Sequence, residues 1–218
     1  MRIGIVGAGR IGGNAGRLFA RAGHDVMFSF SRQPQKLQAL ADETGGRAGT
    51  PAEAAAFGDL VMLSAPWTLV DEALAQAGSL EAKIVIDTTN QFGRSGLEDL
   101  GELTAAQLNA GRMPGARYVK SFNTLTSGFQ AEASQRSGDE RVVLFLCGDD
   151  AEAKAIVAGL IEDAGFVPAD VGGTADAGVM EAPRREGAVY GEEYREPEAR
   201  AVVEALQAGE PIPPTPAY

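Results

Sequence analysis

Residues 2–12 read RIGIVGAGRIG, a short apolar run that leads directly into a glycine-rich turn. The glycines fit the pattern G-x-G-x-x-G, a weak signal by itself because 28 of the 218 residues are glycine. The context is more specific, since the apolar run predicts a strand and residues 10–22 predict an amphipathic helix. A turn in this position presents helix N–H groups to the pyrophosphate of a dinucleotide. The alternative is a turn that only packs a helix on a strand. We predict a dinucleotide site that includes Gly7, Gly9, Arg10, Ile11 and Gly12.

The end of the second predicted strand indicates which dinucleotide binds. A site for NAD places Asp or Glu at this strand end, where the carboxylate holds the ribose 2′-hydroxyl. Here the strand ends in Ser31 and Arg32, Lys36 follows one helical turn later, and no carboxylate occurs between Val26 and Lys36. A hydroxyl, a guanidinium and an ammonium group together suit a 2′-phosphate dianion. The pattern predicts NADP(H) as the cofactor, unless Arg32 and Lys36 are ordinary solvated charges at a helix start.

Short apolar runs alternate with helical stretches through residues 1–173, and this alternation is typical of βαβ units. We predict an α/β fold of the Rossmann type for this dinucleotide-binding domain, with a doubly wound, mainly parallel sheet covered on both faces. Residues 174–218 are charged and poor in aliphatic side chains, so we predict a short irregular or helical C-terminal appendage. Its one expected helix has Pro197 near the first turn and Gly209 just past the end.

Three further strand ends bring polar and aromatic side chains to one edge of the predicted sheet. Ligands of open parallel sheets bind at the carboxyl ends of the strands, where the strand order reverses. We predict that this edge holds the cofactor and a small-molecule acceptor, with the aromatic rings as a wall for a flat ligand. Alternatively, the tryptophan is a core residue and the two asparagines cap turns. The residues concerned are Ala65, Pro66, Trp67, Asn90, Phe122 and Asn123.

The composition excludes several classes of function. The chain has 19 basic and 30 acidic residues, so its formal charge is −11 and nucleic acids or anionic membranes are unfavourable partners. One cysteine and one histidine cannot form a disulfide or a Cys/His metal site. We expect His24 to lie in a surface turn and Cys147 to be a buried small hydrophobe. No run approaches the ~18 apolar residues of a membrane span, so we expect a soluble, cytoplasmic protein.

These segments, in this order and spacing, resemble the NADPH-dependent reductases of the deazaflavin coenzyme factor 420. The same family of NADP oxidoreductases supplies the reductase domain of certain membrane metalloreductases. The resemblance implies that Ser31, Arg32 and Lys36 hold the 2′-phosphate and that Pro66-Trp67 and Phe122-Asn123 flank the nicotinamide. The chain departs from the family in its C-terminal segment, where residues 182–194 replace an apolar stretch, so the acceptor stays open. The matching pieces are residues 3–12, 22–26, 31–32 with Lys36, 65–67, 87–90, 120–125, 147–150, 164–166 and 170–172.

The expected activity is hydride transfer between NADP(H) and a flavin or deazaflavin that binds as a dissociable co-substrate. We assign no catalytic residue, because the cofactor carries the chemistry of hydride transfer and the protein supplies orientation. Two alternatives remain: an NADPH-binding redox sensor without turnover, and a small-substrate imine or hydroxyacid reductase. We also expect a homodimer in which residues 180–206 pack on the partner. That segment carries the sparse apolar residues Val189, Tyr190, Tyr194, Val202, Val203 and Leu206.

Overall fold

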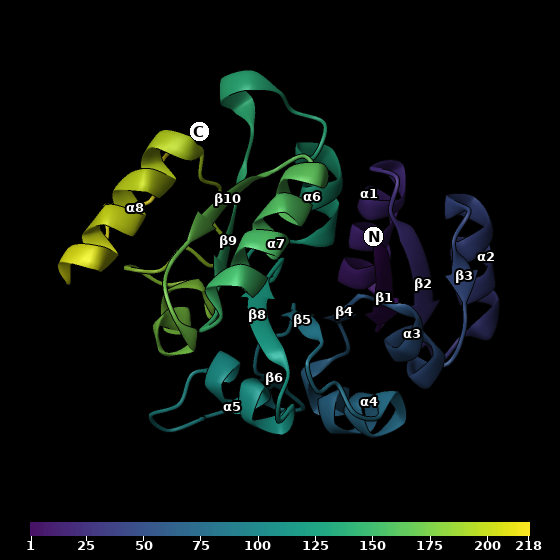
Figure 1. Cartoon of the computed structure of the whole chain (residues 1–218). Helices are drawn as coiled ribbons and strands as arrows, with labels where there is room; N and C mark the ends of the chain where they lie inside the picture. Colours follow the sequence, from purple (N-terminus) through teal and green to yellow (C-terminus); the bar gives the residue numbers. More distant parts are fainter.

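The alternating strands and helices form an eight-stranded sheet in the computed structural model, which describes all 218 residues (Figure 1). The strand order is β10-β9-β8-β5-β4-β1-β2-β3, and every neighbouring pair is parallel except β8 and β9. The predicted doubly wound, mainly parallel fold is therefore confirmed. The strands are β1 (Arg2–Val6), β2 (Asp25–Ser29), β3 (Arg47–Ala48), β4 (Leu60–Leu63), β5 (Ile84–Asp87), β8 (Arg117–Ser121), β9 (Val143–Cys147) and β10 (Val167–Asp170).

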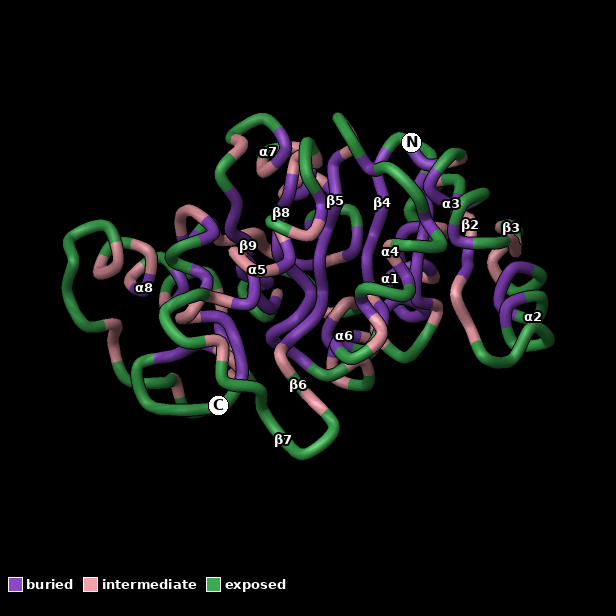
Figure 2. The backbone as a smooth tube through the Cα atoms, turned by 90° about the horizontal axis from the view of Figure 1, so that it is seen from below, coloured by how far each residue is buried: buried purple, intermediate pink, exposed green.

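The strand order reverses between β1 and β4. From β1 the chain moves outward to β2 and β3, and then returns to place β4 on the other side of β1. The loops that leave the carboxyl ends of β1 and β4 therefore diverge, and the space between them is where ligands of such sheets bind. A two-stranded hairpin, β6 (Phe92–Gly93) and β7 (Gly96–Leu97), follows β5 and projects as an exposed loop beyond these ends (Figure 2).

Helices cover both faces of the sheet, and each face has its own apolar core. The core of one face contains side chains from α1 (Arg10–Arg21), α2 (Pro34–Thr44), α6 (Ser127–Ala133) and α7 (Ala151–Asp163). None of the helices has both the length and the apolar character needed to cross a bilayer. The other core contains side chains from α3 (Pro51–Phe57), α4 (Val70–Ala77), α5 (Ala105–Arg112), α8 (Glu196–Ala208) and the 3₁₀ turn η3 (Thr174–Met180). Two further 3₁₀ turns are η1 (Trp67–Leu69), which leads into α4, and the exposed η2 (Gly138–Glu140).

The C-terminal segment, residues 174–218, packs on the end of the sheet formed by β9 and β10. The Val143 N–H donates to the Tyr194 carbonyl at 2.8 Å, and the Tyr194 ring packs edge-on against Phe145 at 5.4 Å. Helix α8 carries a proline in its first turn and ends at a left-handed Gly209, as the sequence predicts. Val189, Tyr194 and Val202 are buried within their own chain. Tyr190, Val203 and Leu206 are only half-buried, and the homodimer through residues 180–206 stays a prediction.

Helix α1 lies close to the sheet because Gly16 has no side chain. A Cβ at this position would come within 2.2 Å of the Phe28 ring on β2 and 2.7 Å of Ile5 on β1. Gly159 is also helical, on α7, but a Cβ there would meet no atom within 4 Å. The two glycines therefore differ in packing alone.

We expect Gly16→Ala to lower the free energy of unfolding by about 1–3 kcal/mol, since added volume in a packed interface displaces its neighbours. Gly159→Ala, the matched control, should raise it by up to about 1 kcal/mol through better helix propensity. Urea denaturation of both variants measures the difference. Equal effects at the two positions would contradict the close packing of α1 on the sheet.

Candidate functional site

A groove of about 950 Å³ lies at the carboxyl ends of β1, β2 and β4. It extends along α1 and α2 and reaches the first turn of α4. The glycine-rich turn, the end of β2 and the turn after β4 come from separate parts of the sequence and meet here, as predicted. Of the predicted site residues, those that line the groove are Gly7, Gly9, Arg10, Ser31, Arg32, Lys36 and Pro66.

Each glycine of the turn has its own structural role. Gly7 has a φ of +115°, and a Cβ there would lie 2.3 Å from the Ser64 carbonyl carbon on the neighbouring strand end. Gly12 faces the turn so closely that a Cβ would lie 2.2 Å from the Gly7 oxygen. Gly9, at the N-cap of α1, meets no atom within 4 Å and gives the first turn no side-chain cap. The N-terminus of α1 is thus left open toward the groove, whereas Gly12 packs against the turn and the half-buried Ile11 packs against the core.

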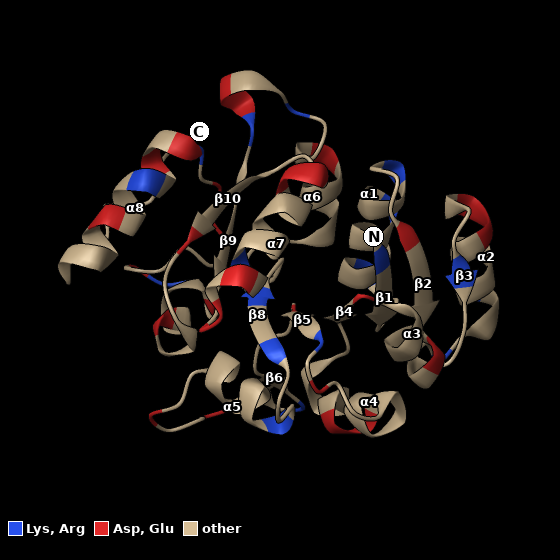
Figure 3. Ribbon diagram, viewed as in Figure 1, with Lys and Arg blue, Asp and Glu red and all other residues tan.

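Positive charge gathers in the groove although the chain as a whole is acidic. Carboxylates are spread over most helices (Figure 3), and about half of the basic residues form ion pairs with carboxylates. Arg10, Arg32 and Lys36 form no ion pair and are exposed at the groove. Arg17 also lines the groove, but Glu43 holds its guanidinium through two 2.7 Å hydrogen bonds. Ser31 Oγ accepts from the Gln33 N–H at 3.1 Å, which shapes the turn between β2 and α2. With four cations and two carboxylates, Glu43 and Glu72, the lining has a net positive charge that suits an anionic ligand.

The structure turns Trp67 away from this groove. Pro66 lines it, whereas the Trp67 side chain is buried on the other side of η1, beside the equally buried Ala65. The indole Nε1 donates to Glu98 Oε2 at 2.6 Å, and the Arg112 guanidinium carbon lies 4.9 Å from the indole centroid. Trp67 instead borders a second hollow, which residues 93–98 of the hairpin complete.

Phe122 and the two predicted asparagines also point inward. The Phe122 ring is fully buried, packs edge-on against Phe19 at 5.7 Å, and has a φ of +60° that turns it into the core. Asn90 Nδ2 donates to the Asn123 carbonyl at 3.0 Å, and Asn123 Nδ2 donates to Asn90 Oδ1 at 3.1 Å and to the Met180 carbonyl at 2.7 Å. None of the three side chains lines the groove: the two asparagines join the C-terminal segment to the ends of β5 and β8, and Phe122 packs in the core.

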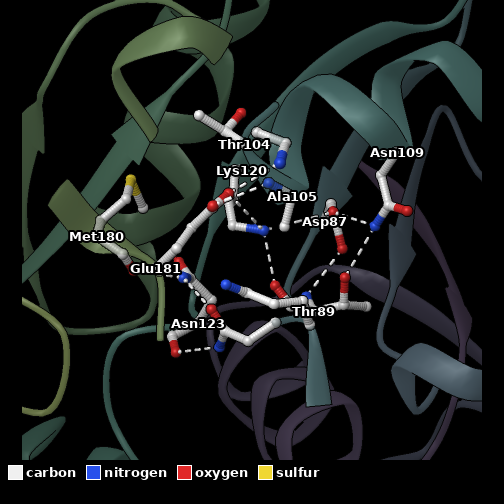
Figure 4. Close-up of polar contacts among 12 residues, drawn as sticks. Asp87, Thr89, Thr104, Ala105, Asn109, Lys120, Asn123, Met180 and Glu181 are labelled. Atoms are coloured by element: carbon white, nitrogen blue, oxygen red, sulfur yellow. Dashed lines mark hydrogen bonds and ion pairs between the residues drawn. The ribbon is translucent and has the colours of Figure 1, made fainter. Parts of the chain in front are cut away.

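A buried charge cluster lies directly behind these contacts, and sequence reasoning missed it (Figure 4). Lys120 is fully buried, and its Nζ donates to the Thr89 carbonyl at 2.7 Å. The same nitrogen lies 3.5 Å from Glu181 Oε1 and 3.7 Å from Asp87 Oδ2. A cation in this environment requires carboxylate partners, because desolvating an unpaired charge costs several kcal/mol.

Both carboxylates of the cluster have further donors. Glu181 accepts the N–H groups of Ala105 and Ala106 at the start of α5, at 2.9 and 2.8 Å. Asp87 accepts from the Tyr118 hydroxyl at 2.6 Å and from Asn109 Nδ2 at 2.8 Å. Burial and the Asp87 carboxylate raise the pKa of Tyr118 well above its usual value, so the phenol stays protonated and donates. Glu181 thereby binds the C-terminal segment to both the sheet and α5.

Cys147 and His24, the single cysteine and the single histidine, both lie outside the groove. Cys147 is fully buried on β9, and burial raises the pKa of its thiol to about 12, so it is an unreactive core residue as predicted. His24 follows the α1 turn at the amino ends of the strands, where its Nε2 lies 3.0 Å from Asp163 Oδ2. Neither residue is near the groove.

We expect Lys120→Met to lower the free energy of unfolding by about 3–5 kcal/mol, because it leaves two buried carboxylates without their cation. Glu181→Gln should cost less, about 1–3 kcal/mol, since it weakens two N–H bonds but leaves Lys120 paired with Asp87. Guanidinium denaturation gives both values. Arg200→Met, which removes only an exposed ion pair with Glu196, is the control and should change stability little. A Lys120→Met variant as stable as the control would contradict the charged cluster.

Comparison with known proteins finds one matching family and a relative described as a metalloreductase. Residues 2–91, which contain every residue of the groove, match the family described as NADP oxidoreductase, coenzyme F420-dependent. The chain is 26% identical over 181 residues to the Metalloreductase STEAP3 of Rattus norvegicus, a match that covers 83% of this chain and 36% of that protein. The chain thus spans about a third of the length of this relative.

Two solved structures are similar over most of their length. A hypothetical protein from Sinorhizobium meliloti has a TM-score of 0.79 and 28% identity, covering 90% of this chain and 95% of its own. A protein described as a putative F420-dependent NADP-reductase from Arthrobacter sp. FB24 has a TM-score of 0.72 and 25% identity, covering 81% and 87%. The N-terminal part of the chain, residues 2–91, thus matches an NADP oxidoreductase family, and most of the chain shares the fold of these two structures.

Proposed function

We propose that this protein transfers hydride from NADPH to an acceptor ring of the flavin or deazaflavin type. The observation that carries the proposal is the groove, in which a glycine turn and three unpaired cations meet and the β2 end has no carboxylate. An anionic dinucleotide is the ligand that such a groove suits. The names of the relatives, a metalloreductase and an F420-dependent NADP-reductase, describe reductases as well.

The residues of the groove divide into two phosphate-binding parts. The open N-terminus of α1 at Gly9, with Arg10 beside it, suits the pyrophosphate, because backbone N–H groups and the helix dipole both favour an anion. Ser31, Arg32 and Lys36 suit the 2′-phosphate at the other end of the groove. The guanidinium of Arg32 is free to form parallel hydrogen bonds with two phosphate oxygens.

The chain's own contribution to the reaction is binding and orientation. When bound, NADPH supplies the hydride, so the protein needs no nucleophile. The buried titratable side chains are also occupied within the core. Tyr118 donates to Asp87, Lys120 donates to the Thr89 carbonyl, and Cys147 is enclosed on β9, so none of the three faces the groove. Our assignment of no catalytic residue therefore remains part of the proposal.

We expect Arg32→Ala to weaken NADPH binding by about ten- to a few-hundred-fold and to leave NADH binding nearly unchanged. The 2′-phosphate carries close to two negative charges that the guanidinium meets, whereas the 2′-hydroxyl of NADH offers no comparable charge. Titration at fixed ionic strength, followed by the fluorescence of the reduced nicotinamide, gives the dissociation constants.

Arg21→Ala serves as the matched control, because Arg21 is exposed on α1, forms no ion pair and lies outside the groove. It should leave both constants unchanged. Equal losses for NADPH and NADH in Arg32→Ala would assign Arg32 to the fold or to the pyrophosphate. An unchanged NADPH constant would remove the main residue of the proposed 2′-phosphate site.

A further inference from the structure

One wall of the nucleotide groove has no role in the two phosphate-binding parts. This wall is formed by the end of β4 and by helix α4, and its lining residues are Pro66, Leu69, Glu72 and Gln76. Leu69, Glu72 and Gln76 follow one another at spacings of three and four residues, which places them on the same side of the helical turns. The α4 wall therefore presents an apolar side chain and two polar side chains to the groove together.

Glu72 is an exposed carboxylate in a groove whose net charge suits an anion, and it forms no ion pair. The other carboxylate of the groove, Glu43, is held by Arg17. The one hydrogen bond of the Glu72 side chain comes from Gln76, whose Nε2 donates to Glu72 Oε1 at 3.1 Å. Glu72 Oε2 and Gln76 Oε1 are then two neighbouring acceptors without a donor. Such a pair suits an amino group, which carries two N–H donors.

Apolar surface adjoins these acceptors on the α4 wall. Pro66 is exposed and Leu69 is half-buried where they line the groove. The opposite wall, formed by α1 and α2, differs because Arg17, Lys36 and Glu43 place charges along it and its leucines are buried. A planar ring binds where apolar groups cover its face and a few polar groups meet its edge. Of the two walls, the α4 wall is the one that suits a base.

The base of NADP(H) has to lie close to the proposed 2′-phosphate site. Base and phosphate are bonded to adjacent carbons of one ribose, so a phosphate held by Ser31, Arg32 and Lys36 keeps the base in the same groove. Adenine carries its exocyclic amino group on the six-membered ring, where both N–H groups are donors. This donor edge is the complement of the two acceptors on α4.

We propose that Glu72 and Gln76 are specificity-determining residues that recognise the amino group of the adenine of NADP(H). This inference rests on the proposed function, since it requires the dinucleotide in the groove. The amino group donates to Glu72 Oε2 and to Gln76 Oε1, and Leu69 with Pro66 covers the base. Hypoxanthine has a carbonyl oxygen in place of the amino group, so it brings an acceptor against two acceptors. The groove thus selects the base as well as the phosphates.

The test compares NADPH with its hypoxanthine analogue, which has the same phosphates, riboses and nicotinamide. The fluorescence of the reduced nicotinamide reports the binding of both nucleotides without turnover, in titrations at one fixed ionic strength. We expect the wild type to bind NADPH about three- to ten-fold more tightly than the analogue, because one net hydrogen bond contributes about that much.

Glu72→Gln separates recognition of the base from the electrostatic field of the groove. Loss of one negative charge should tighten the binding of both nucleotides to a similar extent. The amide keeps an acceptor for Gln76 and turns a donor toward the base, so the ratio of the two dissociation constants should fall to about one. A role of Glu72 in stabilising α4 alone would not move this ratio. Glu162→Gln, which changes an exposed glutamate of α7 outside the groove, is the matched control and should keep the full ratio.

Equal constants for NADPH and the hypoxanthine analogue in the wild type would overturn the inference. An unchanged ratio in Glu72→Gln would overturn it as well. Either result would leave the proposed function standing, because both nucleotides would still bind through their phosphates. Failure of NADPH to bind the wild type would overturn the proposed function and this inference with it.

Discussion

The close approach of α1 to the seam between β1 and β4 is the constraint on which the nucleotide half of the molecule depends. A helix can begin this close to two strand ends only where no side chain intervenes. Gly7 and Gly12 meet this condition, because a Cβ at either residue would clash with neighbouring backbone atoms. Because the approach is close, the N–H groups of the first helical turn face the groove rather than the core. Packing and anion binding thus follow from the same glycines.

The other half of the sheet depends on charge rather than on close backbone packing. Lys120 on β8 is matched in register with Asp87 on β5, and Glu181 completes the cluster from a segment that follows the last strand. The N-terminus of α5 gives Glu181 two hydrogen bonds, so the excess negative charge of the cluster is met by backbone N–H groups. The C-terminal segment is therefore part of the core of this face and determines which strand ends stay open.

The sequence predicts the fold and the nucleotide groove well, because their signals are local. A glycine turn after an apolar run, the residues at the end of β2 and the proline and glycine of α8 each depend on neighbours within a few positions. The sequence does not indicate which way the side chains of Phe122, Asn90 and Asn123 point. Strands buried on both faces lack the alternation of polar and apolar residues that would show it. Glu181 gave no signal, since it lies in a charged stretch that resembles a solvated surface.

Three cations without an ion pair, Arg10, Arg32 and Lys36, meet in the groove where the β2 end and the α1 N-terminus come together, although the chain as a whole is acidic. Selective binding of NADP(H) in this groove requires that the 2′-phosphate itself, apart from the nicotinamide or any acceptor, be recognised there. Calorimetric titration of the wild-type protein with adenosine 2′,5′-bisphosphate and with adenosine 5′-monophosphate isolates this group. We predict that the bisphosphate binds at least about ten-fold more tightly at fixed ionic strength. Equal affinities for the two nucleotides would contradict the assignment of the groove to NADP(H).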